Sequence, residues 1–279
     1  MADQTPTDQS LGEDLSTNPS ADVEMSEGGA AGSELPYAGE ETGLEAELEP
    51  ARVLFIDYLS SPIVTLIVGS DDSQTILTAH QALLGLSPYF KDQFEGFSDD
   101  GSPRQLELQD DVDAVGCFLE YLYTGEYFPK KNPGLRTLET DPSIPAVDET
   151  GEQLLKHARV YTLAEKFQLP SLRALASAKI HCVNSTARGE IAYAQYVYAN
   201  TPEDDTTIRA PVANFWASRS HSLRSEAEPE FKALCLEFPQ FGYDVLTRVL
   251  DEKLKRESNA KLHPGVSASG RKRSRHSNA

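Results

Sequence analysis

The stretch "PIVTLIVGSDDSQTILTAH", residues 62–80, constrains the fold of this chain more than any other. It contains two runs rich in β-branched residues, Ile63–Val68 and Thr75–Thr78, which is typical of strands. A Gly-Ser-Asp-Asp sequence follows the first run, so the two runs are predicted to pair as a β-hairpin. A third short strand is predicted in "RQLELQD", residues 104–110, where leucines alternate with polar residues.

The pattern then changes to helical spacing in "DDVDAVGCFLEYLYTG", residues 110–125. Asp110 or Asp111 is available as the N-cap, and Gly125 is expected to end this helix. Residues 129–151 contain four prolines and no periodicity, which predicts a long loop.

Helical patterns occupy almost all of the chain beyond this loop. One apolar stripe ends near residue 167, and Pro170 is suited to the first turn of the next helix. Four further amphipathic segments are predicted, with Pro202, Pro229 and Pro239 as breakers between them: 191–198, 208–223, 231–238 and 241–254. Strands followed by many helices indicate the α+β class.

The two ends of the chain have a different composition. Residues 1–50 are rich in Asp, Glu, Ser and Gly and contain no Lys or Arg, so we expect a disordered acidic tail. Residues 257–279 are expected to be a disordered basic tail that contains "GRKRSRH". The folded part is therefore expected to span residues 51–256.

Composition excludes several classes of protein. The net charge of −19 argues against a nucleic-acid-binding protein, because phosphates attract a basic face. Cys117, Cys182 and Cys235 are widely spaced, which predicts reduced thiols and no metal site. The chain shows no membrane span and no signal-peptide pattern at its first residues, so we expect an intracellular protein in the nucleus, the cytoplasm or both.

The segment "HQALLGLSPYF", residues 80–90, raises the question of catalysis, because His80 and Ser87 could be a base and a nucleophile. Pro88 argues against this, since it lacks the N–H that an oxyanion hole would use. The alternative is a structural corner in which Ser87 caps a helix that begins at Pro88. In that corner, the ring nitrogens of His80 are expected to bind buried backbone groups.

The order of these segments resembles the BTB/POZ domain. The resemblance covers about residues 60–182, and the domain is expected to span residues 51–182 including the 129–151 loop, with a helical extension over residues 183–256. That extension is similar to the one in fungal BTB-only proteins. The family markers are His80, Leu83, Leu84, Ser87, Pro88 and Phe90, then Phe118, Leu122, Tyr123, Thr124 and Gly125. The helical pair that closes the domain is matched by Ala158, Tyr161, Ala164, Phe167, Leu172 and Leu175.

Three features depart from the family pattern. The spacing between His80 and Ser87 is one residue shorter than in many animal members, and the loop at 129–151 is longer than usual. The first strand lacks the aspartate found near its start in dimeric transcription-factor members. The resemblance therefore leaves the choice between monomer and homodimer open.

The resemblance implies a non-catalytic module for protein–protein interaction, without cofactor, small-molecule substrate, nucleic acid or membrane as its partner. One branch of the family recruits a cullin scaffold for ubiquitin ligation through a hydrophobic-x-acidic triplet. Phe97-Ser98-Asp99 matches that triplet, so Phe97 and Asp99 are candidate partner-binding residues.

A second hypothesis is a nuclear scaffold or transcriptional co-factor. Its basis is the cluster Arg271, Lys272, Arg273 and Arg275, whose charge density is typical of a nuclear-import signal. An enzyme is the third class, but the sequence contains no glycine-rich phosphate loop and no metal-ligand spacing. The aromatic residues of the extension fit a helical core better than a peptide groove: Tyr193, Tyr196, Tyr198, Phe215 and Trp216.

Overall fold

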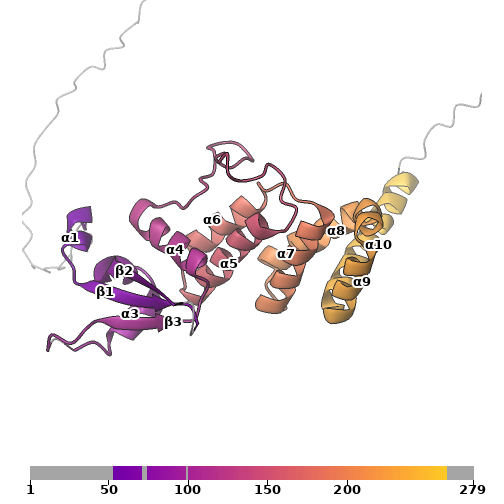
Figure 1. Cartoon of the computed structure of the whole chain (residues 1–279). Coiled ribbons are helices and arrows are strands. Elements are labelled where there is room, and N and C mark those ends of the chain that lie inside the picture. Colours follow the sequence, from indigo (N-terminus) through magenta and orange to yellow (C-terminus); the bar gives the residue numbers. More distant parts are fainter. Residues whose placement is uncertain (1–52, 71–73, 99, 263–279) are drawn as a thin grey trace, which may run out of the picture. The chain divides into compact units, whose positions relative to one another are not determined.

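The structure is a computed structural model that describes residues 53–70, 74–98 and 100–262 (Figure 1). The acidic segment 1–50, Asp99 and the basic cluster at 271–275 lie outside these residues. All described residues belong to one unit, which begins at Arg52.

A three-stranded sheet forms the N-terminal part of the fold. The predicted hairpin is confirmed: β1 (Ile63–Val68) pairs antiparallel with β2 (Thr75–His80), and Ile63 lies opposite His80. The predicted third strand, β3 (Gln105–Leu108), pairs parallel with β1, which gives the order β2-β1-β3. Alternate side chains of β1 are buried, so one face of the sheet belongs to the core.

Three short helices flank the sheet. Helix α1 (Phe55–Leu59) precedes β1, and α2 (Gln81–Leu84) with α3 (Pro88–Phe94) form the corner between β2 and β3. The α+β class is confirmed by this sheet and by the helices that follow.

Helix α4 (Val112–Thr124) begins and ends at the predicted residues. The Asp111 carboxylate accepts a 2.9 Å hydrogen bond from the Ala114 N–H, which satisfies a free donor of the first turn. Gly125 ends the helix in the left-handed conformation, with φ of 77°, which only glycine adopts without strain.

Six helices follow the 129–151 loop in the described chain, and they pack mainly on near neighbours in the sequence. Helix α5 contacts α4, α6 and α7, α7 contacts α8, and α8 contacts α10. Their bounds are α5 (Glu152–Lys166), α6 (Pro170–Ile180), α7 (Ala187–Asn200), α8 (Thr206–Glu226), α9 (Glu228–Glu237) and α10 (Pro239–Leu262). Helix α10 continues past the expected boundary at residue 256 to Leu262, and the ion pair of Glu252 with Arg256 supports the helix just before that boundary.

Pro202 lies between α7 and α8 as predicted, whereas other prolines of this region lie within helices. Pro229 lies in the first turn of α9 and Pro239 is the first residue of α10, where their missing N–H groups would have no partner. Pro211, in contrast, lies inside α8.

Two aromatic clusters hold the core together. In the first, the ring of Phe167 lies 4.8 Å from the rings of both Phe90 and Phe118, which joins α3, α4 and the end of α5. In the second, Trp216 lies 5.1 Å from Phe231 and 6.0 Å from Phe241. Trp216 is fully buried, which agrees with the prediction that the aromatic residues of the extension form a core.

The segment after α4 is fixed to α6 by a buried lysine that the sequence analysis did not identify. Lys179 is fully buried, and its Nζ donates to the carbonyl oxygens of Tyr127 and Pro129. The Glu126 carboxylate lies 2.6 Å from the same nitrogen and supplies the opposite charge. Burial lowers the pKa of Lys179, and Glu126 acts against this shift.

The far end of the 129–151 loop is fixed by Asp148. Its buried carboxylate accepts from the N–H groups of Gly151, at 2.8 Å, and Leu154, at 3.0 Å, at the start of α5. Gly151 has a φ of 88°, and a Cβ there would lie 2.8 Å from the carbonyl oxygen of Gly189. A glycine is therefore required where the loop approaches α7.

Candidate functional site

The corner at residues 80–90 does not bring His80 and Ser87 together as a catalytic pair. The Ser87 hydroxyl donates a 2.7 Å hydrogen bond to the carbonyl oxygen of Phe167. The expectation that the Ser87 side chain caps α3 is therefore wrong, although Ser87 occupies the N-cap position. The hydroxyl is fully buried beside a carbonyl that needs a donor, and Pro88 contributes no N–H to the first turn.

The expectation that His80 binds backbone groups is also wrong. Its ring nitrogen Nδ1 lies 2.7 Å from the hydroxyl of Tyr123. The same hydroxyl accepts a hydrogen bond from the backbone N–H of His80, at 3.1 Å. The histidine and tyrosine of the resemblance thus contact each other across 43 residues. The remaining markers have structural positions: Leu83, Leu84 and Phe90 are buried, Pro88 begins α3 and Gly125 ends α4.

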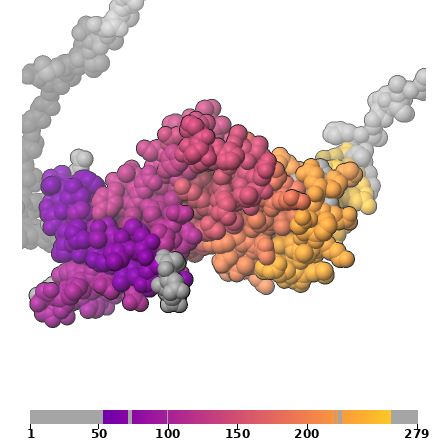
Figure 2. All heavy atoms as spheres, viewed as in Figure 1, coloured from indigo at the N-terminus to yellow at the C-terminus, as the bar shows by residue number. Residues whose placement is uncertain are grey.

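One set of large apolar side chains is exposed on α1 and the hairpin. Helix α1 has no buried residue, and Ile56 is 61% exposed. Ile76 of β2 is 69% exposed, because the outer face of the hairpin has no covering element at that position. Figure 2 shows the indigo atoms of α1 next to the purple atoms of the hairpin. We call this set the N-terminal apolar surface, and it consists of Leu54, Phe55, Ile56, Leu59, Ile63 and Ile76.

A second set lies on α9 and α10. Helix α10 buries Phe241 and Val245 against its neighbours, yet it carries another apolar stripe on the opposite side. Burial separates the two stripes, whereas the sequence pattern predicted only that segments 231–238 and 241–254 are amphipathic helices. Apolar residues on two faces of one helix were the sequence signal that could have indicated a second, exposed stripe. We call this set the C-terminal apolar surface, and it consists of Leu236, Tyr243, Leu246, Val249, Leu250 and Leu254.

The candidate triplet Phe97-Ser98-Asp99, which follows α3, lies only partly within the described residues. Phe97 is half-buried, with its ring 5.3 Å from that of Phe94 and the guanidinium of Arg104 6.0 Å from its centre. Ser98 is exposed, and Asp99 is not among the described residues. The described part of the triplet therefore has one partly exposed aromatic ring.

Several buried titratable groups in the BTB-like part have partners inside the protein. His157 is buried, its Nδ1 lies 2.9 Å from the hydroxyl of Tyr127, and burial lowers its pKa to about 3. Over the described residues there is no cluster of His, Cys, Asp or Glu suited to a metal ion. In the same part of the chain, no helix is both long and apolar enough to cross a bilayer.

Comparison with known proteins gives one match. The family model of the BTB/POZ domain matches residues 63–181, which include the sheet, the corner, α4, the loop, α5 and α6. A search of curated proteins found no match. The BTB/POZ domain is a module for protein–protein interaction. Residues 63–181 of the chain are therefore a BTB/POZ domain.

Proposed function

We propose that this chain is a non-catalytic adaptor that docks one protein on its BTB/POZ domain and another on its helical extension. The observation that carries the proposal is that most of the exposed large apolar side chains belong to either the N-terminal or the C-terminal apolar surface. Concentrated apolar side chains on a protein surface mark interaction sites. An adaptor requires two such sites.

The absence of catalysis is part of the proposal. It is supported by the hydrogen bonds of His80 and Ser87, which use these polar groups to join α2 and α3 to α4 and α5. A nucleophile and its base would instead lie within hydrogen-bond distance of each other.

The adaptor is tested by whether a change in one surface removes only the partners of that surface. We would compare the proteins captured by the full chain with those captured by Phe55→Asp and by Leu246→Glu. Leu135→Glu is the matched control, because Leu135 is 59% exposed and belongs to neither surface. We expect each of the two variants to lose different proteins. An identical loss in both variants would contradict two independent sites.

We further propose that the BTB/POZ domain recruits a cullin scaffold through Phe97 and Asp99, which are not part of the N-terminal apolar surface. The half-exposed ring of Phe97 beside the start of the next loop supports this assignment. Purified cullin N-terminal domain should bind the wild type and the exposed-site control Ser98→Ala, and Phe97→Ala should weaken binding at least about tenfold. Failure of the folded wild type to bind would remove the cullin from the proposal.

The alternative role, a nuclear scaffold or transcriptional co-factor, is based on the basic cluster Arg271, Lys272, Arg273 and Arg275. Residues 258–279 fused to a fluorescent reporter should direct it to the nucleus. The same fusion with all four residues changed to alanine should remain diffuse. A diffuse signal from the unchanged fusion would remove this alternative.

A further inference from the structure

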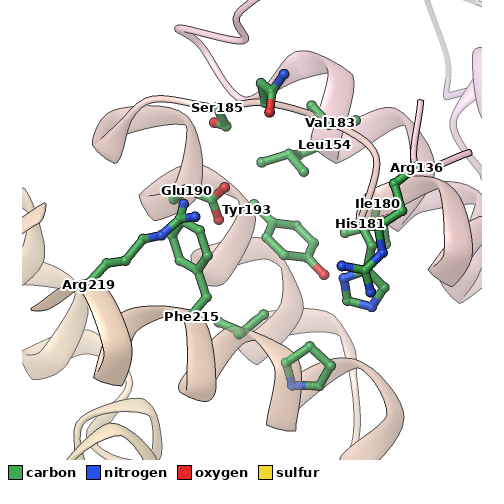
Figure 3. A pocket seen from close by; sticks show the side chains of 13 residues that line it. Arg136, Leu154, Ile180, His181, Val183, Ser185, Glu190, Tyr193, Phe215 and Arg219 are labelled. Carbon is green, nitrogen blue, oxygen red and sulfur yellow. The ribbon is translucent and has the colours of Figure 1, made fainter. Parts of the chain in front are cut away.

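A cavity of about 370 Å³ lies between the 129–151 loop, the connection from α6 to α7, and helices α5, α7 and α8 (Figure 3). Its volume falls in the lower part of the range for small-molecule sites. It contains no residue of the two apolar surfaces, so it is independent of the proposed adaptor function.

Two residues of the cavity wall are mostly buried, and their polar side-chain groups have no hydrogen-bond partner among the described residues. Glu190 is 8% exposed and Tyr193 is 5% exposed, and both belong to α7. Among the described residues, neither the carboxylate of Glu190 nor the hydroxyl of Tyr193 makes a hydrogen bond. Neither group is among the fully enclosed polar atoms without a partner in the described residues, so both face the space of the cavity and can bind a species that enters it.

The Glu190 end of the cavity is balanced in charge. Burial raises the pKa of Glu190 to about 7, and the positive charge of Arg219 opposes this shift. Figure 3 shows the guanidinium of Arg219 next to the Glu190 carboxylate. An incoming charged group therefore finds no excess of either sign at this end.

The other end is positive. In Figure 3 the hydroxyl of Tyr193 points toward His181 and Arg136. The pKa of His181 is lowered first by burial and then by the positive charges of Arg136 and Lys131. Burial also raises the pKa of Tyr193, so its hydroxyl stays protonated and can donate. Donors and positive charge converge here, which is the arrangement that binds an anion.

The walls between the two ends are apolar. Leu154, Ile180 and Val212 are buried, and the ring of Phe215 is half-buried beside them. A ligand that fills the cavity would place a hydrophobic part against these side chains.

We propose that this cavity binds a small organic anion, with its carboxylate or phosphate group between Arg136, His181 and the hydroxyl of Tyr193, and its apolar part against Leu154, Val212 and Phe215. The polar group of the ligand that reaches Glu190 is a hydrogen-bonding hydroxyl or amide. The carboxylate and the phosphate share the same recognition chemistry.

Four probes that share a phenyl ring and differ in their polar group test which head group the cavity prefers. The full chain is titrated with benzoate, phenyl phosphate, benzyl alcohol and benzylamine by isothermal titration calorimetry. We expect at least one of the two anions to bind about tenfold more tightly than the alcohol, because a charged hydrogen bond is lost in the alcohol. The stronger of the two anions identifies the head group as carboxylate or phosphate. Equal affinity for anion, alcohol and amine would overturn the proposal, as would no binding at all.

Two variants test the site. Tyr193→Phe removes one hydroxyl, and Arg136→Gln removes one charge at an exposed position that does not contribute to the core. Each should weaken binding of the preferred anion about tenfold. Arg248→Gln, exposed and outside the cavity, should leave it unchanged. If Tyr193→Phe does not fold, Arg136→Gln alone decides.

A competition experiment with a peptide tests whether the cavity binds a small molecule or an acidic segment of the chain itself. Residues 34–49 contain several glutamates, and a peptide of this sequence is added to the chain saturated with the preferred anion. No displacement is expected. Displacement at lower peptide than anion concentration would overturn the small-molecule assignment and give the cavity to that segment.

Discussion

The Ser87 hydroxyl and the Phe167 carbonyl oxygen are joined by a 2.7 Å hydrogen bond between residues 80 positions apart. Ser87 is the N-cap residue of the corner helix α3, and Phe167 follows the last residue of α5. The bond therefore connects the strand-rich part of the BTB/POZ domain to its closing helices, next to the cluster of Phe90, Phe118 and Phe167.

Ser87→Ala should lower the free energy of unfolding by about 1–3 kcal/mol, because it leaves a buried carbonyl without its donor. Urea denaturation measures the change. Ser98→Ala, at an exposed position, is the control and should be neutral. An unchanged midpoint in Ser87→Ala would mean that another donor reaches Phe167.

Lys179→Met should destabilise the domain strongly. The substitution leaves the Glu126 carboxylate and the carbonyl oxygens of Tyr127 and Pro129 without their common donor. Removal of one partner from a buried ion pair costs about 3–5 kcal/mol. Lys166→Met is the matched control, since Lys166 pairs with Asp110 at the surface and should contribute at most about 1 kcal/mol. Similar losses in both variants would contradict the special role of Lys179.

Acid should destabilise the protein through His157. Its pKa falls from 6.5 to about 3 on folding, so the folded state binds fewer protons. Stability is therefore complete above pH 6.5 and is lost as the pH falls toward 3, by on the order of 4 kcal/mol in all. His157→Gln should flatten this dependence in denaturation curves between pH 6.5 and 4, whereas the exposed-site variant His221→Gln should follow the wild type. A wild-type curve as flat as that of His157→Gln would refute the assignment.

Glu190 should have the opposite pH dependence. Its pKa rises from 4.5 to about 7 on folding, so the folded state binds more protons, and stability falls as the pH rises from 4.5 through 7. The total loss is on the order of 3 kcal/mol. Glu190→Gln should therefore be more stable than the wild type at pH 8 and equal to it at pH 4, with the exposed Glu203→Gln as control. Equal stability of Glu190→Gln and the wild type at pH 8 would show that Glu190 ionises freely.

Local patterns predicted the elements that depend on local physics. The hairpin follows from β-branched runs on both sides of a turn, and the ends of α4 follow from Asp111 and Gly125. These signals lie within a few residues of the element they define, so one sequence suffices to find them.

The partners of polar side chains could not be predicted in the same way. Ser87 was assigned to its own helix, but its partner Phe167 comes from α5. Lys179 stands in a pattern that also fits a solvated helix face, and its burial depends on the path of residues 126–129. The proposed anion site combines Arg136 from the loop with Tyr193 from α7, which only the folded chain brings together.

The adaptor claim is tested most directly by the proteins that the full chain captures from cells, quantified for the wild type, Phe55→Asp, Leu246→Glu and the control Leu135→Glu. The account predicts that Phe55→Asp and Leu246→Glu each lose a different group of partners and that Leu135→Glu retains both groups. It would be contradicted if the two variants, folded as judged by circular dichroism, captured the same proteins as Leu135→Glu.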